Sequence, residues 1–336
     1  MPKATLRCDA SPELGFGHVF RCLVLARELR SRGVEVVFAA RGHEHVSGIV
    51  GREGFDTLVI PRDGSDSSEA NQLGETGDLV VVDLLAPSES YQQALRRTGT
   101  PALIIDGSRL TPCHGRWLLD PRPIPDPEHF ERRLRERPET EYLGGPPYAL
   151  YEGGEVPASA PRENRLLISM GGGDDRGAIR SVIENLEGWK RPLELVVQTR
   201  SHNPGLAAIQ EAAAHSTRHA VEVVLDTPLI NEVAGLSWCA IVAGGVSCYE
   251  MLSMGVPLIL IPISDNQEPA ARAWHELEVA HNLGPYPLED GNRLLDALRD
   301  LSRPGRREER SRRGRRLCDG RGAERVAARI LAELGG

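Results

Sequence analysis

Short apolar runs alternate with helical patterns along the first part of the chain. The runs are nearly continuous in Val, Ile and Leu, which is typical of strands buried on both faces. Between them, apolar residues recur at three- and four-residue spacing; one such helix begins near Val19, and Gly33 is placed to end it. This alternation predicts a parallel sheet with helices on both faces. The expected strands are residues 5–10, 34–40, 57–60, 79–85 and 102–106.

The pattern restarts after a stretch rich in glycine and proline. The second set of expected strands is residues 165–170, 193–199, 221–225, 239–243 and 257–263. We therefore predict an α/β protein with two Rossmann-like, doubly wound domains. The expected parts are an N-terminal domain over residues 1–145, a linker over 146–163, a nucleotide-binding domain over 164–318 and a C-terminal helix over 319–336 that crosses back to the N-terminal domain.

Two glycines and a histidine follow the first expected strand. Gly15 and Gly17 allow a close backbone approach, and His18 falls in the first turn of the next helix, where free N–H groups favour an anion. The segment thus predicts a phosphate site with a titratable group beside it. The alternative is a plain turn with His18 as a helix cap. A dinucleotide fingerprint would need glycine where Phe20 stands, which disfavours an NAD-dependent oxidoreductase.

Glycine turns also follow two expected strands of the second domain. The first contains Gly171 and Gly172, and the second runs from Gly244 to Glu250. In the second turn, Ser247 is placed as an N-cap or a phosphate donor. Glu250 can accept hydrogen bonds from the two hydroxyls of a ribose, or it can close a capping box with Ser247.

Composition narrows the class of protein. The chain has 336 residues, a net charge of −8, 40% hydrophobic and 26% charged residues, which argues against a nucleic-acid binder. No apolar stretch is long enough for a membrane span, and the opening residues run into the first strand without an apolar leader, so we expect a cytoplasmic protein. The six cysteines form no C-x-x-C pair and predict buried free thiols. We expect neither a metal nor a cofactor.

The arginine-rich run at residues 303–316 is the one strongly basic segment. We expect a solvated helix in which Glu308 and Glu309 are local partners, with an anionic partner as the alternative.

In order along the chain, these motifs resemble a known family. The matching pieces are 7–9, 15–21, 25–26, 81–83, 105–107, 143–144, 148–150, 168–172, 244–250 and 266–267. The chain is similar to the nucleotide-sugar hydrolase of pseudaminic acid biosynthesis and the related spore-coat polysaccharide proteins. It is more distantly similar to the lipid II-forming glycosyltransferase of peptidoglycan synthesis.

The resemblance implies a GT-B fold with the active site between the two domains. It implies that the C-terminal domain holds UDP, with Glu250 on the ribose, the Ser247 helix start near the diphosphate, and Asn266 and Gln267 near the diphosphate or sugar. It implies a metal-independent reaction in which His18 acts as general base or orients the water. The expected substrate-binding residues are Asp9, Gly15, Gly17, Arg21, Asp83, Gly171, Gly172, Gly245, Val246, Ser247, Cys248, Glu250, Asn266 and Gln267.

We therefore expect a hydrolase that cleaves an NDP-sugar, most simply a UDP-linked deoxy- or amino-sugar, into free sugar and NDP. The alternative is an inverting GT-B glycosyltransferase that transfers the sugar to an organic acceptor; a nucleotide-binding protein without catalysis is a third reading. The chain departs from the hydrolase pattern at Leu84 and Leu85, where those enzymes have His and Tyr, and at Asp106-Gly107. These departures leave the sugar open.

Overall fold

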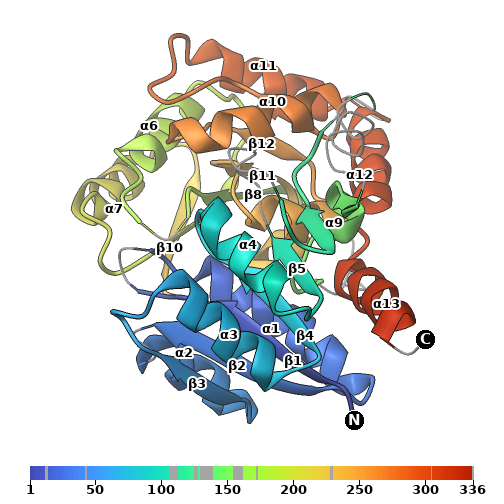
Figure 1. The fold of residues 1–336 in the computed structure, drawn as a ribbon. Coiled ribbons are helices and arrows are strands. Elements are labelled where there is room, and N and C mark those ends of the chain that lie inside the picture. The colour runs from blue at the N-terminus through green and yellow to red at the C-terminus, as the bar shows by residue number, and fades with distance from the viewer. Residues whose placement is uncertain are drawn as a thin grey trace. The chain divides into compact units, whose positions relative to one another are not determined.

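The chain folds into two compact units. The computed structural model describes residues 1–11, 14–41, 44–105, 113–124, 128, 139–153, 162–171, 173–227, 230–303 and 305–334. Met1–Glu152 and Arg321–Gly336 make up the first unit, and Gly153–Gly320 make up the second (Figure 1). Part of the predicted linker, residues 154–161, lies outside the described residues.

The first unit is built on a seven-stranded parallel sheet with the order β3-β2-β1-β4-β5-β6-β7. Its strands are β1 (Lys3–Cys8), β2 (Glu35–Arg41), β3 (Asp56–Ile60), β4 (Leu79–Asp83), β5 (Ala102–Ile105), β6 (Trp117–Asp120) and β7 (Glu141–Gly144). Its α-helices are α1 (Gly17–Ser31), α2 (Glu44–Val50), α3 (Asp66–Thr76), α4 (Glu89–Arg97) and α13 (Gly322–Leu334), with short 3-10 turns η1 (Gly51–Glu53) and η2 (Pro146–Tyr148).

The second unit repeats this plan with a six-stranded parallel sheet in the order β10-β9-β8-β11-β12-β13. Its strands are β8 (Arg162–Ser169), β9 (Glu194–Thr199), β10 (Ala220–Leu225), β11 (Ser237–Val242), β12 (Leu258–Leu260) and β13 (Ala280–Asn282). Its helices are α6 (Ala178–Leu186), α7 (Leu206–His215), α8 (Ile230–Gly235), α9 (Ser247–Ser253), η3 (Asp265–Gln267), α10 (Glu268–Glu276), α11 (Asn292–Leu301) and α12 (Arg306–Leu317).

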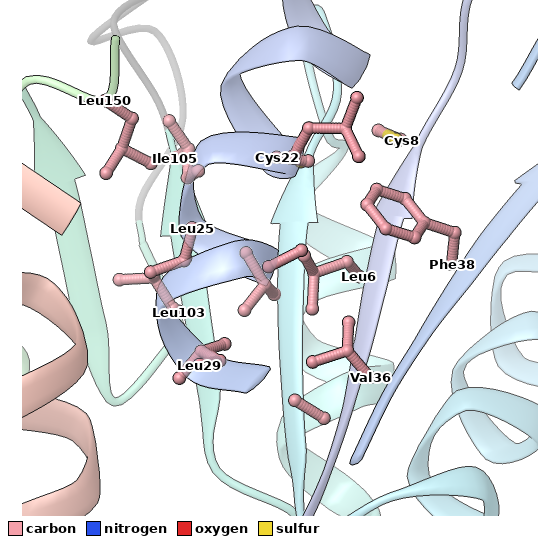
Figure 2. Packing of buried hydrophobic residues seen from close by; sticks show 14 of the residues in the cluster. Leu6, Cys8, Cys22, Leu25, Leu29, Val36, Phe38, Leu103, Ile105 and Leu150 are labelled. Atoms are coloured by element: carbon pink, nitrogen blue, oxygen red, sulfur yellow. The ribbon is translucent and has the colours of Figure 1, made fainter. Parts of the chain in front are cut away.

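Helices cover both faces of the first sheet because each strand alternates its side chains between the faces. Val81 of β4 belongs to the apolar core beneath α1, α2 and α13, whereas its neighbours Val80 and Val82 belong to the core beneath α3 and α4. Figure 2 shows Leu25 and Leu29 of α1 among the strand residues of the first of these cores. The apolar stripe read from the sequence is therefore the face of α1 that packs on the sheet.

The second sheet is covered in the same way. Ile168 of β8 and Ile241 of β11 belong to the core beneath α6, α7 and α11. On the strands' other face, α8 packs against β11 and α9 packs against β12. The serine caps that begin α3 and α4 in the first unit have no counterpart in α9, whose start is described below.

All ten strands expected from the sequence are present, so the prediction of two doubly wound parallel sheets is confirmed. Three further strands, β6, β7 and β13, were not predicted. Each has three or four residues, which is too short for a run of apolar residues to stand out from its surroundings. The predicted strand 79–85 ends two residues early, at Asp83.

The C-terminal helix α13 belongs to the first unit. Val326, Ala327 and Ile330 are fully buried in the core that α1 also lines. Gly322, the first residue of α13, lies so close to the backbone of Ala149 that an added Cβ would overlap the Ala149 carbonyl oxygen. A side chain at position 322 would therefore force α13 away from the sheet.

We predict that Gly322→Ala destabilises the protein by about 1–3 kcal/mol or more, because overpacking against backbone is relieved only by moving the helix. The thermal unfolding midpoint, followed by circular dichroism, should fall clearly. Gly48→Ala is the matched control, since Gly48 also lies in a helix and a Cβ there meets no atom within 4 Å. Equal midpoints for the two variants would show that α13 does not depend on this contact.

Candidate functional site

The order of the first sheet reverses between β1 and β4. In open parallel sheets, ligands bind beyond the carboxyl ends of the strands at this point. The loop that leaves β1 leads into α1 and carries His18, while Asp83 is the last residue of β4 and pairs in register with Cys8 of β1. The topology thus brings two predicted site residues, far apart in the sequence, to one place.

His18 and Asp83 form a hydrogen-bonded pair. The Nδ1 atom of His18 lies 2.7 Å from Oδ1 of Asp83; the Asp83 side chain is fully buried, and 19% of the His18 side chain is exposed. An ionised carboxylate can only accept, so we assign the proton to Nδ1. In the neutral ring this leaves Nε2 as an acceptor, the state that a general base needs.

Arg21 holds the same carboxylate from the other side. Its Nε donates to Oδ2 of Asp83 over 2.6 Å, and its Nη2 donates to Oδ1. Burial alone would raise the pKa of Asp83, but the Arg21 charge and the hydrogen bonds from His18 and Arg21 outweigh it and hold the pKa below its usual value. Asp83 is therefore a carboxylate at neutral pH, fixed in position by both partners.

Two buried thiols, Cys22 and Cys8, lie next to the cluster formed by His18, Arg21 and Asp83. Cys22 lies one turn below His18 on α1, with its Sγ 3.8 Å from Oδ2 of Asp83. Cys8 and complete burial raise the pKa of Cys22, so it remains a neutral thiol. All six cysteines are free and buried, which confirms the prediction of buried thiols.

Asp9 lies in a neighbouring polar network. Arg7 donates to both of its carboxylate oxygens, over 2.6 and 2.9 Å, and the backbone N–H of Arg41 donates to it over 2.8 Å. Buried Glu69 then joins Arg7 to the Arg41 side chain, over 2.7 Å in each case. Asp9 thus anchors the start of the loop that carries His18.

Arg7 and Glu69 were not among the site residues expected from the sequence, although Arg7 lies in the matching piece 7–9. A signal was present, because Thr5, Arg7 and Asp9 alternate with Leu6 and Cys8 at strand spacing. Polar residues on one face of a strand buried on both faces require buried partners.

The glycine turn begins α1 without a side-chain cap. Gly15 adopts a positive φ of 81°, which strains other residues, and its N–H donates to the Ser11 carbonyl over 2.8 Å. The N-cap is Phe16, no side chain caps the helix, and Gly17 is its first residue. The alternative reading of His18 as a helix cap is therefore wrong.

Leu85, two residues beyond Asp83, is 72% exposed.

The second sheet reverses its order between β8 and β11, and two glycine turns follow these strands. The last residues of the strands, Ser169 and Val242, are paired in register, so the turns lie side by side. Gly171 and Gly244 both adopt positive φ, 99° and 106°, which makes glycine the residue suited to each position. Gly172 lies outside the described residues.

The helix after the second turn exposes part of the predicted stretch. Gly245 and Val246 are exposed, and Ser247 and Glu250 are half-buried. The N-cap of α9 is Val246 and no side chain caps the helix, so Ser247 and Glu250 do not form a capping box. Cys248 is fully buried, its N–H donates to the Gly245 carbonyl over 3.1 Å, and burial raises its pKa to about 12.

Gln267 lies beside the Gly244 turn. A Cβ added at Gly244 would lie 3.7 Å from the Gln267 carbonyl oxygen, and the Gln267 side-chain oxygen accepts from the Ile263 N–H over 2.9 Å. The side-chain NH₂ group of Gln267 is thereby oriented by its own loop. Asn266 is exposed and accepts from the Ser264 hydroxyl over 2.6 Å.

In the first unit the structure thus brings together His18, Arg21 and Asp83, and in the second Gly171, the 244–250 stretch and Gln267. Among the described residues, no group of three or more His, Cys, Asp and Glu side chains is arranged to hold a metal ion. No helix in the described part of the chain combines the length and apolar character needed to cross a bilayer.

Comparison with known proteins gives related proteins but no matching family model. The spore coat polysaccharide biosynthesis protein SpsG of Bacillus subtilis is 24% identical, over 97% of this chain and 96% of that protein. The UDP-N-acetylglucosamine–N-acetylmuramyl-(pentapeptide) pyrophosphoryl-undecaprenol N-acetylglucosamine transferase of Acidithiobacillus ferrooxidans is 27% identical, over 95% of this chain and 96% of that protein.

Among solved structures, MurG of Acinetobacter baumannii superposes with a TM-score of 0.76 at 15% identity, covering 98% of this chain and all of that one. The chain has the GT-B fold, which confirms the predicted fold class.

The prediction of a nucleotide-sugar hydrolase is wrong. The relative whose name states an activity is a transferase, and it matches nearly the whole chain. The motifs on which the prediction rested are a glycine turn with a histidine and a second glycine turn with an acidic helix. They suit any enzyme that handles a nucleotide-sugar, and so they did not separate hydrolysis from transfer.

We predict that Asp83→Asn lowers the free energy of unfolding at pH 7 by about 3–5 kcal/mol, because it leaves Arg21 without a buried carboxylate. The folded pKa of Asp83 is depressed. The contribution of ionised Asp83 to the free energy of unfolding is therefore complete at pH values above about 3.9, the ordinary pKa of an aspartate. This contribution is lost as the pH falls through the pKa of Asp83 in the folded protein. Urea unfolding at several pH values should show the gap between wild type and variant narrowing in acid.

Asp63→Asn, which alters an exposed carboxylate of the same unit, is the control for this measurement. This control variant should change the free energy of unfolding little at any pH. A gap for Asp83→Asn that stays constant down to pH 3 would contradict the assignment of Asp83 as a low-pKa carboxylate.

Proposed function

We propose that the chain is an inverting glycosyltransferase that moves a sugar from a nucleotide-sugar to the hydroxyl of an organic acceptor. The observation that carries the base-assisted displacement is the His18–Asp83 pair at the reversal point of the first sheet, with Nε2 of His18 left as an acceptor. The relation to a curated N-acetylglucosamine transferase and to a protein of polysaccharide biosynthesis supports the class of reaction.

In this reaction His18 is the general base. Its Nε2 removes the proton of the acceptor hydroxyl as that oxygen bonds to the anomeric carbon, and the bond from that carbon to the diphosphate breaks. A single displacement of this kind inverts the anomeric centre. Asp83 keeps the ring in the productive tautomer and stabilises the imidazolium that forms, and Arg21 keeps Asp83 in place.

The second unit is the proposed donor site. The two glycine turns at its reversal point, together with Gly245, Val246 and Ser247 at the start of α9, allow a diphosphate to approach backbone N–H groups. Glu250 would accept from the ribose hydroxyls, and the NH₂ group of Gln267, with Asn266, would contact the diphosphate or sugar. The substrate named for the Acidithiobacillus relative supports uridine diphosphate as the nucleotide.

We predict that His18→Ala lowers the rate of transfer by about 10²–10⁴ while the affinity for the donor nucleotide stays within a factor of two, since a base acts on the acceptor. Transfer is measured by mass spectrometry with a panel of UDP-sugars and alcohol acceptors, and nucleotide binding by calorimetry with UDP. His114→Ala is the matched control, because His114 also pairs with a carboxylate, Glu89, over 3.1 Å, but is not bonded to Asp83. Full turnover by His18→Ala would remove the base role.

We predict that wild-type protein prefers UDP over 2′-deoxy-UDP and that Glu250→Gln loses this preference, with UDP affinity reduced about tenfold. A charged acceptor holds a hydroxyl more strongly than a neutral amide does. The two dissociation constants are measured by calorimetry, with Glu184→Gln on α6 as control. An unchanged preference in Glu250→Gln would place the ribose elsewhere.

A further inference from the structure

A cavity of about 190 Å³ lies at the amino end of β11 in the second unit. Trp238, the second residue of β11, lines it together with Arg191, which lies three positions before the start of β9. The rest of the lining comes from the end of α11 and the start of α12, including Arg303 and Arg307. Because strands in this sheet are parallel, the cavity is at the opposite edge from the Gly244 turn.

The lining of the cavity carries excess positive charge. It contains three arginines and one acid, Glu308. Neither Arg191 nor Arg307 forms an ion pair with any acid in the described part of the chain. Arg303 lies 3.9 Å from Asp300, a weak contact.

Asp300 cannot neutralise Arg303, because it is shared. The same carboxylate lies 3.0 Å from Nε2 of His281, 3.6 Å from Arg310 and 3.7 Å from Arg306. One negative charge therefore faces three arginines and a histidine, and the cavity beside them remains attractive to an anion.

The first turn of α12 adds to the positive electrostatic potential at the cavity. The helix spans twelve residues, its N-cap is Gly305, and no side chain caps it. Gly305 itself lines the cavity. The positive end of the helix dipole thus lies beside the three guanidinium groups.

Trp238 contributes a buried side chain to the lining of the cavity. It is only 3% exposed, and its indole N–H has no hydrogen-bond partner in the described part of the chain. Trp117 and Trp274 share this lack, but neither lines this cavity. Buried donors without a partner are uncommon, and this one belongs to a residue that lines a cationic cavity.

We propose that this cavity, defined by Arg191, Trp238, Arg303 and Arg307, is a second anion site that takes a small, soluble phosphate-type oxyanion. Its volume is below the roughly 300–1,000 Å³ of pockets for drug-sized ligands, which suits a phosphate or diphosphate group and not a whole nucleotide-sugar. Phosphate chemistry also suits the guanidinium groups, which can donate in pairs to its oxygens. Because the site is at the other edge of the sheet from the proposed donor site, it does not depend on the proposed function.

The test is calorimetric titration of the full chain with inorganic pyrophosphate at fixed ionic strength. We expect saturable binding by wild type, and a loss of about tenfold or more in affinity in Arg191→Gln and in Arg307→Gln, since each removes a charge-assisted contact. Arg316→Gln removes the same charge from an exposed position of α12 outside the cavity and should bind as wild type does. All four proteins should unfold at the same temperature.

Further arms separate the other sources of binding. Saturating UDP occupies the proposed donor site, and pyrophosphate binding at the cavity should persist in its presence. The proposal is overturned if wild type shows no saturable binding, if UDP abolishes binding while the cavity variants keep it, or if Arg316→Gln loses as much as they do. It is also overturned if Arg191 and Arg307 are needed for sedimentation with phosphatidylglycerol vesicles but not for pyrophosphate, because the ligand is then a lipid headgroup.

Discussion

The buried carboxylate of Asp83 is the interaction on which the carboxyl edge of the first unit depends. Taking a carboxylate out of water costs several kcal/mol unless its partners are well placed. Here the partners, His18 and Arg21, both come from the first turns of α1. Apolar packing holds the body of α1 on the sheet, but packing is tolerant of small shifts, whereas hydrogen bonds to a buried charge are not. The end of β4 thus fixes where the glycine turn and its histidine stand.

The hydrogen bond to Asp83 gives the two ring nitrogens of His18 different roles. With Nδ1 bonded to Asp83, the neutral ring presents Nε2 as a hydrogen-bond acceptor. The neighbouring Arg7–Asp9 anchor holds the other end of the same loop.

The sequence could predict this architecture because the strands of both sheets are buried on both faces and read as unbroken apolar runs. The sequence motifs pointed to His18 and to Asp83 separately. Their pairing follows from the observed strand order, in which β1 and β4 are neighbours and Cys8 pairs in register with Asp83. The short strands β6, β7 and β13 and the partners of Arg7 could not be read in this way. Their signals are cross-strand contacts between residues such as Arg7 and Glu69, which are 62 positions apart.

The prediction of hydrolysis instead of transfer was wrong for a different physical reason. A histidine held by a carboxylate removes a proton from water or from an alcohol with the same geometry, so His18 and Asp83 do not distinguish the two nucleophiles. The donor groups do not distinguish them either, since the leaving diphosphate is the same. The difference lies in whether water or an acceptor hydroxyl reaches the base, which depends on the groups that exclude water from the site and orient the acceptor and not on the base itself.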